Sequence, residues 1–489
     1  MEFEPTIGIE THAQLLTRSK MFCRCATASS LQQQESSKTV PAPNSLVCPV
    51  CLGMPGALPT INRRAVEQVI MTALALNCQI PSVSRFDRKN YNYPDLVKGY
   101  QISQSYLPLG REGWVSIEVN GETTRVGIHD VHLEEDTGKL LHVHGQSLID
   151  YNRSGVPLME IVTEPDLTSV DQTQEYVLKL RRMLRYLGVS SGNMEEGAMR
   201  FEANISLHPA GTETKGTRVE VKNLNSFRAL LRSLEYEIER QSRVLRQGGK
   251  VARETRGWNE TDGATFSQRS KEMADDYRYF PEPDLPPLVI TSEWIDRIRA
   301  EMPELPDARY RRLMAQYQLP PYDAGLLTDE RAVADYFEAS VAQGQGLNLS
   351  PKTISNWITG ELFRLLHGRS VDIGSSPVAP GALVELIRLV ESGVITGTTG
   401  KRVLDRMFET GRSAQDIVDR EQLAQISDAE ELSAVIDLVI ADNADAVAQF
   451  RAGKETVLRF LVGQVMKATR GKANPELAAD LLQERLAAA

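Results

Sequence analysis

The sequence predicts an α+β protein, in which a strand-rich first domain is followed by an all-α helical domain and a small all-α tail domain. Its 489 residues exceed what one hydrophobic core normally organises, so two or three domains are expected. Up to about residue 290, short runs alternate apolar and polar side chains between glycines and prolines. After the proline-rich segment 281–287, apolar residues recur at helical spacing. We therefore expect domains at 1–292, 293–410 and 411–489, with a Gly-Arg-Ser break marking the second boundary.

Three of the predicted strands carry polar groups along one face. Residues 8–15, 130–134 and 200–207 each alternate polar with mainly apolar side chains, and alternate side chains of a strand point to opposite faces. One such strand alone is compatible with the solvated face of an antiparallel sheet. Three together, each rich in possible metal ligands, predict a shared functional surface.

Helices are predicted both within the first domain and throughout the chain that follows it. Within the first domain, leucines and other apolar residues recur at helical spacing over 171–187 and 227–244. The later helices are predicted at 293–302, 306–317 and 382–389, and from 430 to the C-terminus.

Composition and charge restrict the class of protein. The chain is 41% hydrophobic and 25% charged, as in ordinary globular proteins, and its net charge of -10 argues against a general polyanion binder. Any contact with nucleic acid must come from a local basic patch. The acidic start does not resemble a secretory signal, and no apolar run reaches membrane-spanning length, so we expect a cytoplasmic protein that does not bind membranes.

Two common catalytic motifs are absent from the sequence. There is no Gly-x-x-x-x-Gly-Lys-Ser/Thr loop, so a nucleotide would not be held by a Walker-type cradle. The run 397–402 looks similar but lies in the helical part without a preceding strand, and it is interpreted as the start of a helix. No Gly-x-Ser-x-Gly elbow is present either.

Four of the five cysteines form two close pairs that predict a structural zinc site. The pairs are Cys23-x-Cys25 and Cys48-x-x-Cys51, the second followed by glycine. Four thiolates brought together by a loop suit the tetrahedral coordination of zinc and leave no open position for a substrate. The alternative is a set of free core thiols, because structural disulfides are rare in the cytosol.

A second kind of site is predicted from the acidic residues of the strands. Carboxylate oxygens suit magnesium, which in enzymes often bridges carboxylates and nucleotide phosphates. Clustered acids on adjacent strands would repel one another without a cation. His12 is either a further ligand or a hydrogen-bond donor. The candidate residues are Glu10, His12, Glu134, Glu135, Glu160 and Glu202.

Basic and aromatic residues lie near these acids in the sequence. The run 85–95 mixes Arg and Lys with Tyr and Phe, which suits contact with phosphate plus a base or ribose. Arg218, Glu220 and Lys222 alternate on another predicted strand. Each run alone fits a solvated charged face, but beside an acidic metal site they resemble a phosphoryl-transfer pocket.

Several of these runs, taken in order, resemble one protein family, the B subunit of the aspartyl/glutamyl-tRNA(Asn/Gln) amidotransferase. The resemblance covers nearly the whole chain. It is carried by residues 8–12, 85–91, 133–136, 150–158, 160–166, 194–197, 221–227, 276–284 and 463–475.

The resemblance implies a cradle-shaped catalytic domain, a helical domain and a tail that contacts tRNA. It also implies a ligase reaction, in which ATP phosphorylates the side-chain carboxylate of Glu or Asp misacylated onto tRNA(Gln) or tRNA(Asn), and ammonia then displaces phosphate. Ammonia would come through a channel from an amidase subunit that hydrolyses glutamine, and a third, small subunit would complete a heterotrimer.

The resemblance further implies roles for individual residues. His12, Glu135 and Lys89 are expected to be catalytic, with Lys89 near the transferred group or the acceptor end of the tRNA. The expected magnesium ligands are His12, Glu10, Glu135 and Glu134, and the expected ATP-binding residues are Glu10, Glu134, Glu160, Glu202, Asn204 and Lys222. The family usually has Asp where this chain has Glu202, so one extra methylene changes the reach of that carboxylate.

Two other functions stay open at this stage: a non-catalytic, zinc-containing RNA-binding scaffold and a magnesium-dependent phosphohydrolase that does not act on tRNA. The tail also has two interpretations. Its cations Lys454, Arg459, Lys467, Arg470 and Lys472 either contact tRNA phosphates or form an ordinary solvated helix face.

Overall fold

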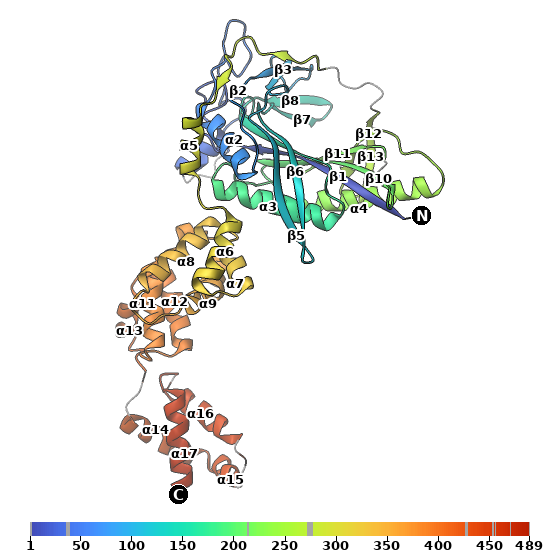
Figure 1. Cartoon of the computed structure of the whole chain (residues 1–489). Coiled ribbons are helices and arrows are strands. Elements are labelled where there is room, and N and C mark those ends of the chain that lie inside the picture. The colour runs from blue at the N-terminus through green and yellow to red at the C-terminus, as the bar shows by residue number, and fades with distance from the viewer. Residues whose placement is uncertain are drawn as a thin grey trace. The chain divides into compact units, whose positions relative to one another are not determined.

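The computed structural model describes residues 2–35, 40–212, 215–270, 277–425, 429–451, 454, 456–469 and 471–488. Asp276 and Arg470 lie outside these residues. The chain forms two compact units, Met1–Leu305 and Pro306–Ala489, shown in Figure 1. The first is built around a large sheet and the second is helical, which confirms the predicted α+β class.

An eight-stranded sheet forms the centre of the first unit. Its strand order is β13-β12-β11-β10-β1-β9-β6-β5. Neighbouring strands are antiparallel, except that β11 and β12 are parallel. The strands are β1 (Phe3–Gln14), β5 (Gly110–Val119), β6 (Glu122–Glu135), β9 (Pro157–Thr163), β10 (Met199–Pro209), β11 (Val219–Leu224), β12 (Glu254–Asn259) and β13 (Ala264–Ser270).

Two long helices, α3 (Val170–Leu187) and α4 (Phe227–Arg246), pack against the sheet (Figure 1). Both were predicted from their apolar spacing. The side chain of Ser169 caps α3 and that of Ser226 caps α4, each by accepting a backbone N–H of the first turn. Gly188 ends α3 in the left-handed conformation, which glycine adopts without steric cost. The apolar faces of both helices join the apolar side of the sheet in one core, so the polar groups of the strands are left on the other side.

Smaller elements complete the first unit. A three-stranded sheet has the order β14-β3-β4, and two-stranded pairings join β15 to β2 and β7 to β8. The strands are β2 (Val83–Ser84), β3 (Asp87–Asn90), β4 (Tyr100–Ser103), β7 (Lys139–Val143), β8 (Gln146–Asp150), β14 (Phe280–Pro281) and β15 (Leu288–Val289). The helices are α1 (Ala28–Glu35), α2 (Arg63–Ala75) and α5 (Ser292–Glu301).

Helix α5 belongs to the first compact unit, so the unit extends past the sequence-based boundary at 292/293. Ile298 of α5 is buried in the same core as the sheet, and α5 contacts α2. The proline-rich segment 281–287 therefore packs against this unit, since Leu285, and Ile290 just after the segment, are buried in its core.

The second unit is helical throughout its described part. Its elements are α6 (Pro306–Tyr317), α7 (Pro321–Leu327), α8 (Arg331–Gln343), α9 (Pro351–Asn356), a π-helical turn (Trp357–Leu362), α10 (Phe363–Gly368), a 3-10 turn (Ile373–Ser375), α11 (Pro380–Glu391), α12 (Gly397–Thr410), α13 (Ala414–Arg420), α14 (Ala429–Asp442), α15 (Ala444–Arg451), α16 (Val457–Ala468) and α17 (Pro475–Ala488). Among the described residues, no helix is long and apolar enough to span a bilayer.

Two hydrophobic clusters lie within this helical unit. One includes residues of α6 to α13 and ends at Leu423, and the other begins at Leu432 in α14. Gly411 ends α12 in the left-handed conformation, at the break that the sequence indicated. The chain continues into α13, whose Ile417 and Val418 are buried in the first cluster. The run at 397 begins α12, with Thr396 as its cap, as interpreted from sequence.

Candidate functional site

The polar rows of three adjacent strands meet on one face of the large sheet. Antiparallel pairing places Glu10 opposite Glu202 and His12 opposite Arg200, and on its other side His12 lies opposite Glu160. Paired residues project to the same side of a sheet, so these groups gather on one surface. The intervening Phe201, like its apolar neighbours, is buried in the core on the opposite side. Of the three strands predicted to share this surface, β1 and β10 are direct neighbours, and β6 joins them across β9, where His132 lies opposite Glu160.

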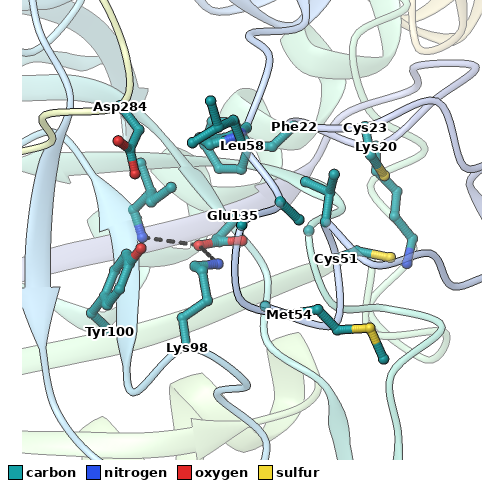
Figure 2. A pocket seen from close by; sticks show the side chains of 17 residues that line it. Lys20, Phe22, Cys23, Cys51, Met54, Leu58, Lys98, Tyr100, Glu135 and Asp284 are labelled. Atoms are coloured by element: carbon teal, nitrogen blue, oxygen red, sulfur yellow. Dashed lines mark hydrogen bonds and ion pairs between the residues drawn. The ribbon is translucent and has the colours of Figure 1, made fainter.

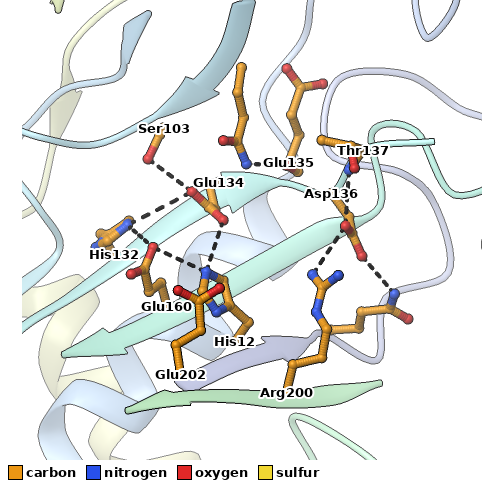
Figure 3. Close-up of polar contacts among 12 residues, drawn as sticks. His12, Ser103, His132, Glu134, Glu135, Asp136, Thr137, Glu160, Arg200 and Glu202 are labelled. Carbon is orange, nitrogen blue, oxygen red and sulfur yellow. Dashed lines mark hydrogen bonds and ion pairs between the residues drawn. The ribbon is translucent and has the colours of Figure 1, made fainter. Parts of the chain in front are cut away.

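The first group of possible metal ligands is His12, Glu134 and Glu160, called here the histidine cluster (Figure 3). His12 Nε2 lies 3.4 Å from Glu160 Oε2 and 3.8 Å from Glu134 Oε1. His132 approaches Glu160 from the other side, with its Nε2 3.0 Å from the same oxygen, and its Nδ1 lies 2.7 Å from Asp130 Oδ1. Because Glu160 lies between two imidazoles, the ionised carboxylate and the protonated imidazoles stabilise one another.

Burial and charge act against each other in this cluster. Burial disfavours the imidazolium of His12, but attraction and hydrogen bonding to Glu160, followed by attraction to Glu134, raise its pKa to about 9. Burial disfavours the Glu160 carboxylate too, yet His12 and His132 hold its pKa well below the ordinary value. Glu134 has a raised pKa because of burial and then the nearby charge of Glu160. The site therefore strongly favours positive charge.

A second group, Glu10, Glu202 and Glu220, is called here the carboxylate cluster. Lys222 Nζ lies 2.6 Å from Glu202 Oε2 and 3.0 Å from Glu220 Oε1. Asn204 Nδ2 donates to Glu10 Oε1 at 2.8 Å. Burial, followed by repulsion from Glu160 and Glu202, raises the pKa of Glu10, so electrostatic coupling connects the two clusters. Glu202 stays within this group despite its extra methylene.

Glu220 was not among the predicted ligands. Its alternation with Arg218 and Lys222 was visible in the sequence, but that run was interpreted as a basic one. The Lys222 ammonium pairs with two carboxylates, so the run contributes to the carboxylate cluster and is not a separate basic patch. Which charged residues pair across neighbouring strands depends on the strand register, and the sequence alone does not show that register.

The structure does not bring Glu135, one of the predicted magnesium ligands, into the histidine cluster. The two residues are consecutive in β6, and consecutive side chains of a strand point to opposite sides. Figure 3 shows Glu135 directed away from His12 and Glu134. Its Oε1 accepts from Ile102 N at 3.0 Å and from Lys98 Nζ.

Glu135 instead lines a separate pocket of about 250 Å³ (Figure 2). Lys98 and Tyr100 form part of its wall, and residues 50–59 of the cysteine-bearing loop form another part. Gly53 lets this loop pack closely, because a Cβ there would lie 2.8 Å from the Lys98 side chain. The pocket therefore lies between Glu135 and the cysteine-bearing loop.

Lys89 of β3 is partly buried and lies within electrostatic range of the acids. Burial would lower the pKa of its ammonium, but the charge of Glu134, followed by Tyr279 and Glu160, raises it above the ordinary value. Lys89 Nζ lies 5.0 Å from the centre of the Tyr277 ring. The sequence indicated Lys89 but did not show that Tyr277 would contact it or that Tyr279 would lie near it.

The four predicted zinc ligands come together. The Sγ atoms of Cys23, Cys25, Cys48 and Cys51 all lie within 4.8 Å of one another, and all four residues are free thiols. Cys51 Sγ is 3.8 Å from Cys48 Sγ and 4.0 Å from Cys25 Sγ. Tetrahedral zinc with bonds of about 2.3 Å requires sulfur atoms about 3.8 Å apart, so the arrangement fits zinc. Cys78 is buried elsewhere in the sheet core.

The chain is similar to known proteins over nearly its full length. Residues 5–296 match the family described as the GatB/GatE catalytic domain, and residues 335–486 match the GatB domain. The aspartyl/glutamyl-tRNA(Asn/Gln) amidotransferase B subunit of Moorella thermoacetica is 53% identical over 99% of this chain and 100% of its own. The same subunit of Thermomicrobium roseum is 52% identical over 99% of each chain. That of Roseiflexus castenholzii is 49% identical over 100% of each chain.

Proposed function

Because the chain belongs to the family of aspartyl/glutamyl-tRNA(Asn/Gln) amidotransferase B subunits, we propose that it is the synthetic subunit of a tRNA-dependent ligase. Its reaction is the ATP-dependent amidation of Glu on tRNA(Gln), of Asp on tRNA(Asn), or of both. The observation that carries this proposal is the pair of clusters, histidine and carboxylate, that share one face of the sheet.

The reaction needs a site for negative charge. A carboxylate is a poor acyl electrophile, since attack by ammonia would have to expel an oxide. Transfer of the terminal phosphoryl group of ATP to the carboxylate oxygen gives an acyl phosphate, with ADP as the other product. The nitrogen of ammonia then forms the amide bond as the carbon–oxygen bond to phosphate breaks. Positioning and charge neutralisation supply most of the catalysis in such transfers.

The two clusters fit magnesium by the chemistry of their donors. Carboxylate oxygens with one imidazole, on adjacent strands, form a set that hard divalent cations accept. We propose His12, Glu134 and Glu160 as one set of ligands and Glu10, Glu202 and Glu220 as the other. When bound, magnesium would neutralise phosphate charge during transfer. The imidazole of His12 must be neutral to serve as a ligand, so binding a cation releases its proton.

The cations near these acids are proposed to contact the nucleotide or the transferred group. The charges of Glu134 and Glu160 raise the pKa of the Lys89 ammonium. A lysine that stays protonated suits a role beside the phosphoryl group. Lys222 and Asn204 hold the carboxylates of Glu202 and Glu10 by the contacts given above. They would fix these oxygens for a metal ion and the phosphates of ATP.

Glu135 is proposed to act from its own pocket rather than as a metal ligand. It is adjacent in sequence to Glu134 but faces the opposite side of β6, with Lys98 as its partner. A channel for ammonia must approach the acyl group from a direction that the nucleotide does not occupy. We propose that ammonia passes through the Glu135 pocket, where the Glu135 carboxylate can accept its hydrogen bonds.

Zinc and the partner proteins complete the proposal. The cysteine site would hold a structural zinc ion, because four thiolates leave no open position. A glutamine-hydrolysing amidase and a third, small subunit of the heterotrimer are the expected partners. The tail would contact tRNA through cations such as Lys454, Arg459 and Lys467, which are exposed.

The test is amide formation by the chain assembled with its partner proteins. Glu-tRNA(Gln) and Asp-tRNA(Asn) are supplied with MgATP and free ammonia, which removes the need for glutamine hydrolysis. The wild-type assembly should form the amide on at least one substrate, and His12→Ala should not. Turnover of ATP that ignores misacylated tRNA would favour a phosphohydrolase instead. Unchanged amidation in the variant would favour a scaffold role for this face.

A further inference from the structure

Residues 277–284, called here the strap, run along β3 at the side of the acidic site. In β14, Phe280 pairs with Arg88 and Pro281 with Asp87. Asn90 extends the contact, since its backbone N–H and its side-chain amide both donate to Tyr277 O at 3.0 Å. The strap therefore follows β3 from its end at Asn90 back to Asp87.

Arg88 fixes the strap on one face of β3. It donates to both carboxylate oxygens of Glu282, at 2.7 and 2.9 Å, and to Asp284 at 3.2 Å. Its guanidinium lies 4.2 Å from the centre of the Tyr100 ring. Glu282 is buried and Arg88 partly so, and this bidentate pair anchors the strap to β3.

Lys89 projects from the other face of β3, because side chains alternate. There the strap supplies Tyr277, whose ring centre is 5.0 Å from Lys89 Nζ. The ring packs edge to face against those of Tyr91, at 6.0 Å, and Tyr279, at 5.8 Å. Such contacts limit rotation of the central ring. The anchor on one face of β3 thus fixes an aromatic surface on the other.

An ammonium on a flexible four-carbon side chain needs a partner that directs it without neutralising it. A carboxylate would neutralise the charge, whereas the electron-rich face of a ring attracts a cation without neutralising it and leaves N–H donors available on the other side. Lys89 lies near enough to Glu134 and Glu160 for their charges to raise the pKa of its ammonium. Tyr277 therefore contacts Lys89 from the side of the strap.

We propose that Tyr277 is a positioning residue, whose aromatic face holds the Lys89 ammonium toward the phosphoryl group that the histidine cluster receives. This inference rests on the proposed function and adds a residue to it. The structural alternative is that Tyr277 only fills space beneath the strap. The two accounts differ in what an aliphatic side chain of similar size would do at this position.

The experiment compares Tyr277→Phe with Tyr277→Leu in the assembled enzyme, with ammonia as nitrogen donor. Phenylalanine keeps the ring face, so kcat should remain within about twofold of the wild-type value. Leucine fills space without that face, and kcat should fall by about tenfold, the scale of a partly desolvated cation–π contact. KM for ammonia, which does not contact this ring, should stay unchanged. Tyr277→Met is used in the same way if the leucine variant fails to fold.

A double-mutant cycle separates positioning from packing. In a Lys89→Met background, Tyr277→Leu should cause no further loss of kcat, because the ammonium it positions is gone. The matched control is Trp114→Leu, which removes a cation–π contact of 4.6 Å with Arg125 elsewhere in the unit. It should leave kcat unchanged once folding is verified by circular dichroism.

Three results would overturn the inference: wild-type kcat for Tyr277→Leu, an equal loss for Tyr277→Phe and Tyr277→Leu, or an undiminished effect of Tyr277→Leu in the Lys89→Met background. Failure of the proposed function gives a different pattern. In that case the wild-type assembly would form no amide, or His12→Ala would retain amidation, whatever the Tyr277 variants do.

Discussion

His12 and Glu160 are direct register partners across β1 and β9, and His12 Nε2 lies 3.4 Å from Glu160 Oε2. Because β9 lies between β1 and β6, His132 reaches the same carboxylate from the opposite strand, at 3.0 Å. Glu160 is therefore held between two imidazoles and remains ionised although it is buried. This arrangement gives the sheet a buried anionic centre.

Loss of His12 should abolish most of the amidation activity without unfolding the protein. We expect His12→Ala to lower kcat for amide formation by at least about 100-fold, the scale of lost electrostatic stabilisation in phosphoryl transfer. The measurement uses MgATP and ammonia with each misacylated tRNA. His129→Ala is the control, since His129 forms an exposed pair with Glu164 at 2.8 Å outside both clusters. Equal activity of the two variants would contradict the site.

The Lys222 ammonium should partly take the place of a metal cation in the carboxylate cluster. In Lys222→Met, Glu202 and Glu220 lose their shared positive partner, and repulsion between them should destabilise the fold. We expect Tm to fall by a few degrees in chelator and to recover on addition of magnesium. Differential scanning calorimetry with and without magnesium checks this. A loss of Tm that magnesium does not restore would argue against a cation site here.

The cysteine cluster should bind one zinc ion per chain. Cys51→Ser removes one of four thiolates and should lower both the zinc content and the Tm, because structural zinc contributes directly to folding stability. Cys78→Ser should retain zinc, since Cys78 lies outside the cluster. Atomic absorption on both purified variants makes the comparison. Full zinc content in Cys51→Ser would show that the Cys51 thiolate is not a zinc ligand.

The helical unit should lose an ion-pair contribution in acid. Hydrogen bonds from Arg312, followed by those from Arg309, lower the pKa of Glu338 from 4.5 to about 2. A lowered pKa in the folded state means that the contribution is complete above pH 4.5 and lost as pH falls toward 2. Glu338→Gln should therefore lower Tm at pH 7 but differ less from wild type at pH 3. Exposed Glu391→Gln serves as the comparison, and a constant difference across pH would refute the linkage.

The fold class and the polar face of the sheet could be predicted because polar and apolar residues alternate visibly along the strand sequences. Residues 200–207 show which side chains share a face, and the cysteine spacing shows which thiols a loop can bring together. The same logic applied to β6 separates Glu134 from Glu135. The acidic residues of the strands, and then the family resemblance, grouped Glu135 with Glu134 as a metal candidate, but the structure does not place it in the histidine cluster.

The remaining features depend on contacts between distant segments. Glu220 joins Glu10 only because β10 lies between β11 and β1. Tyr277 reaches Lys89 only through the pairing of β14 with β3, across nearly 190 residues of sequence. No local pattern encodes these registers, because each is set by packing of the whole unit. The end of the first unit likewise depends on how α5 packs against α2.

The most direct test compares two adjacent residues, Glu134 and Glu135. Manganese serves as a spectroscopic substitute for magnesium, and its binding is followed by electron paramagnetic resonance in the assembled enzyme with an ATP analogue. We predict that Glu134→Gln weakens binding by at least about tenfold, whereas Glu135→Gln binds manganese as the wild type does. Equal binding by both variants, or weaker binding only in Glu135→Gln, would contradict the histidine cluster as the metal site.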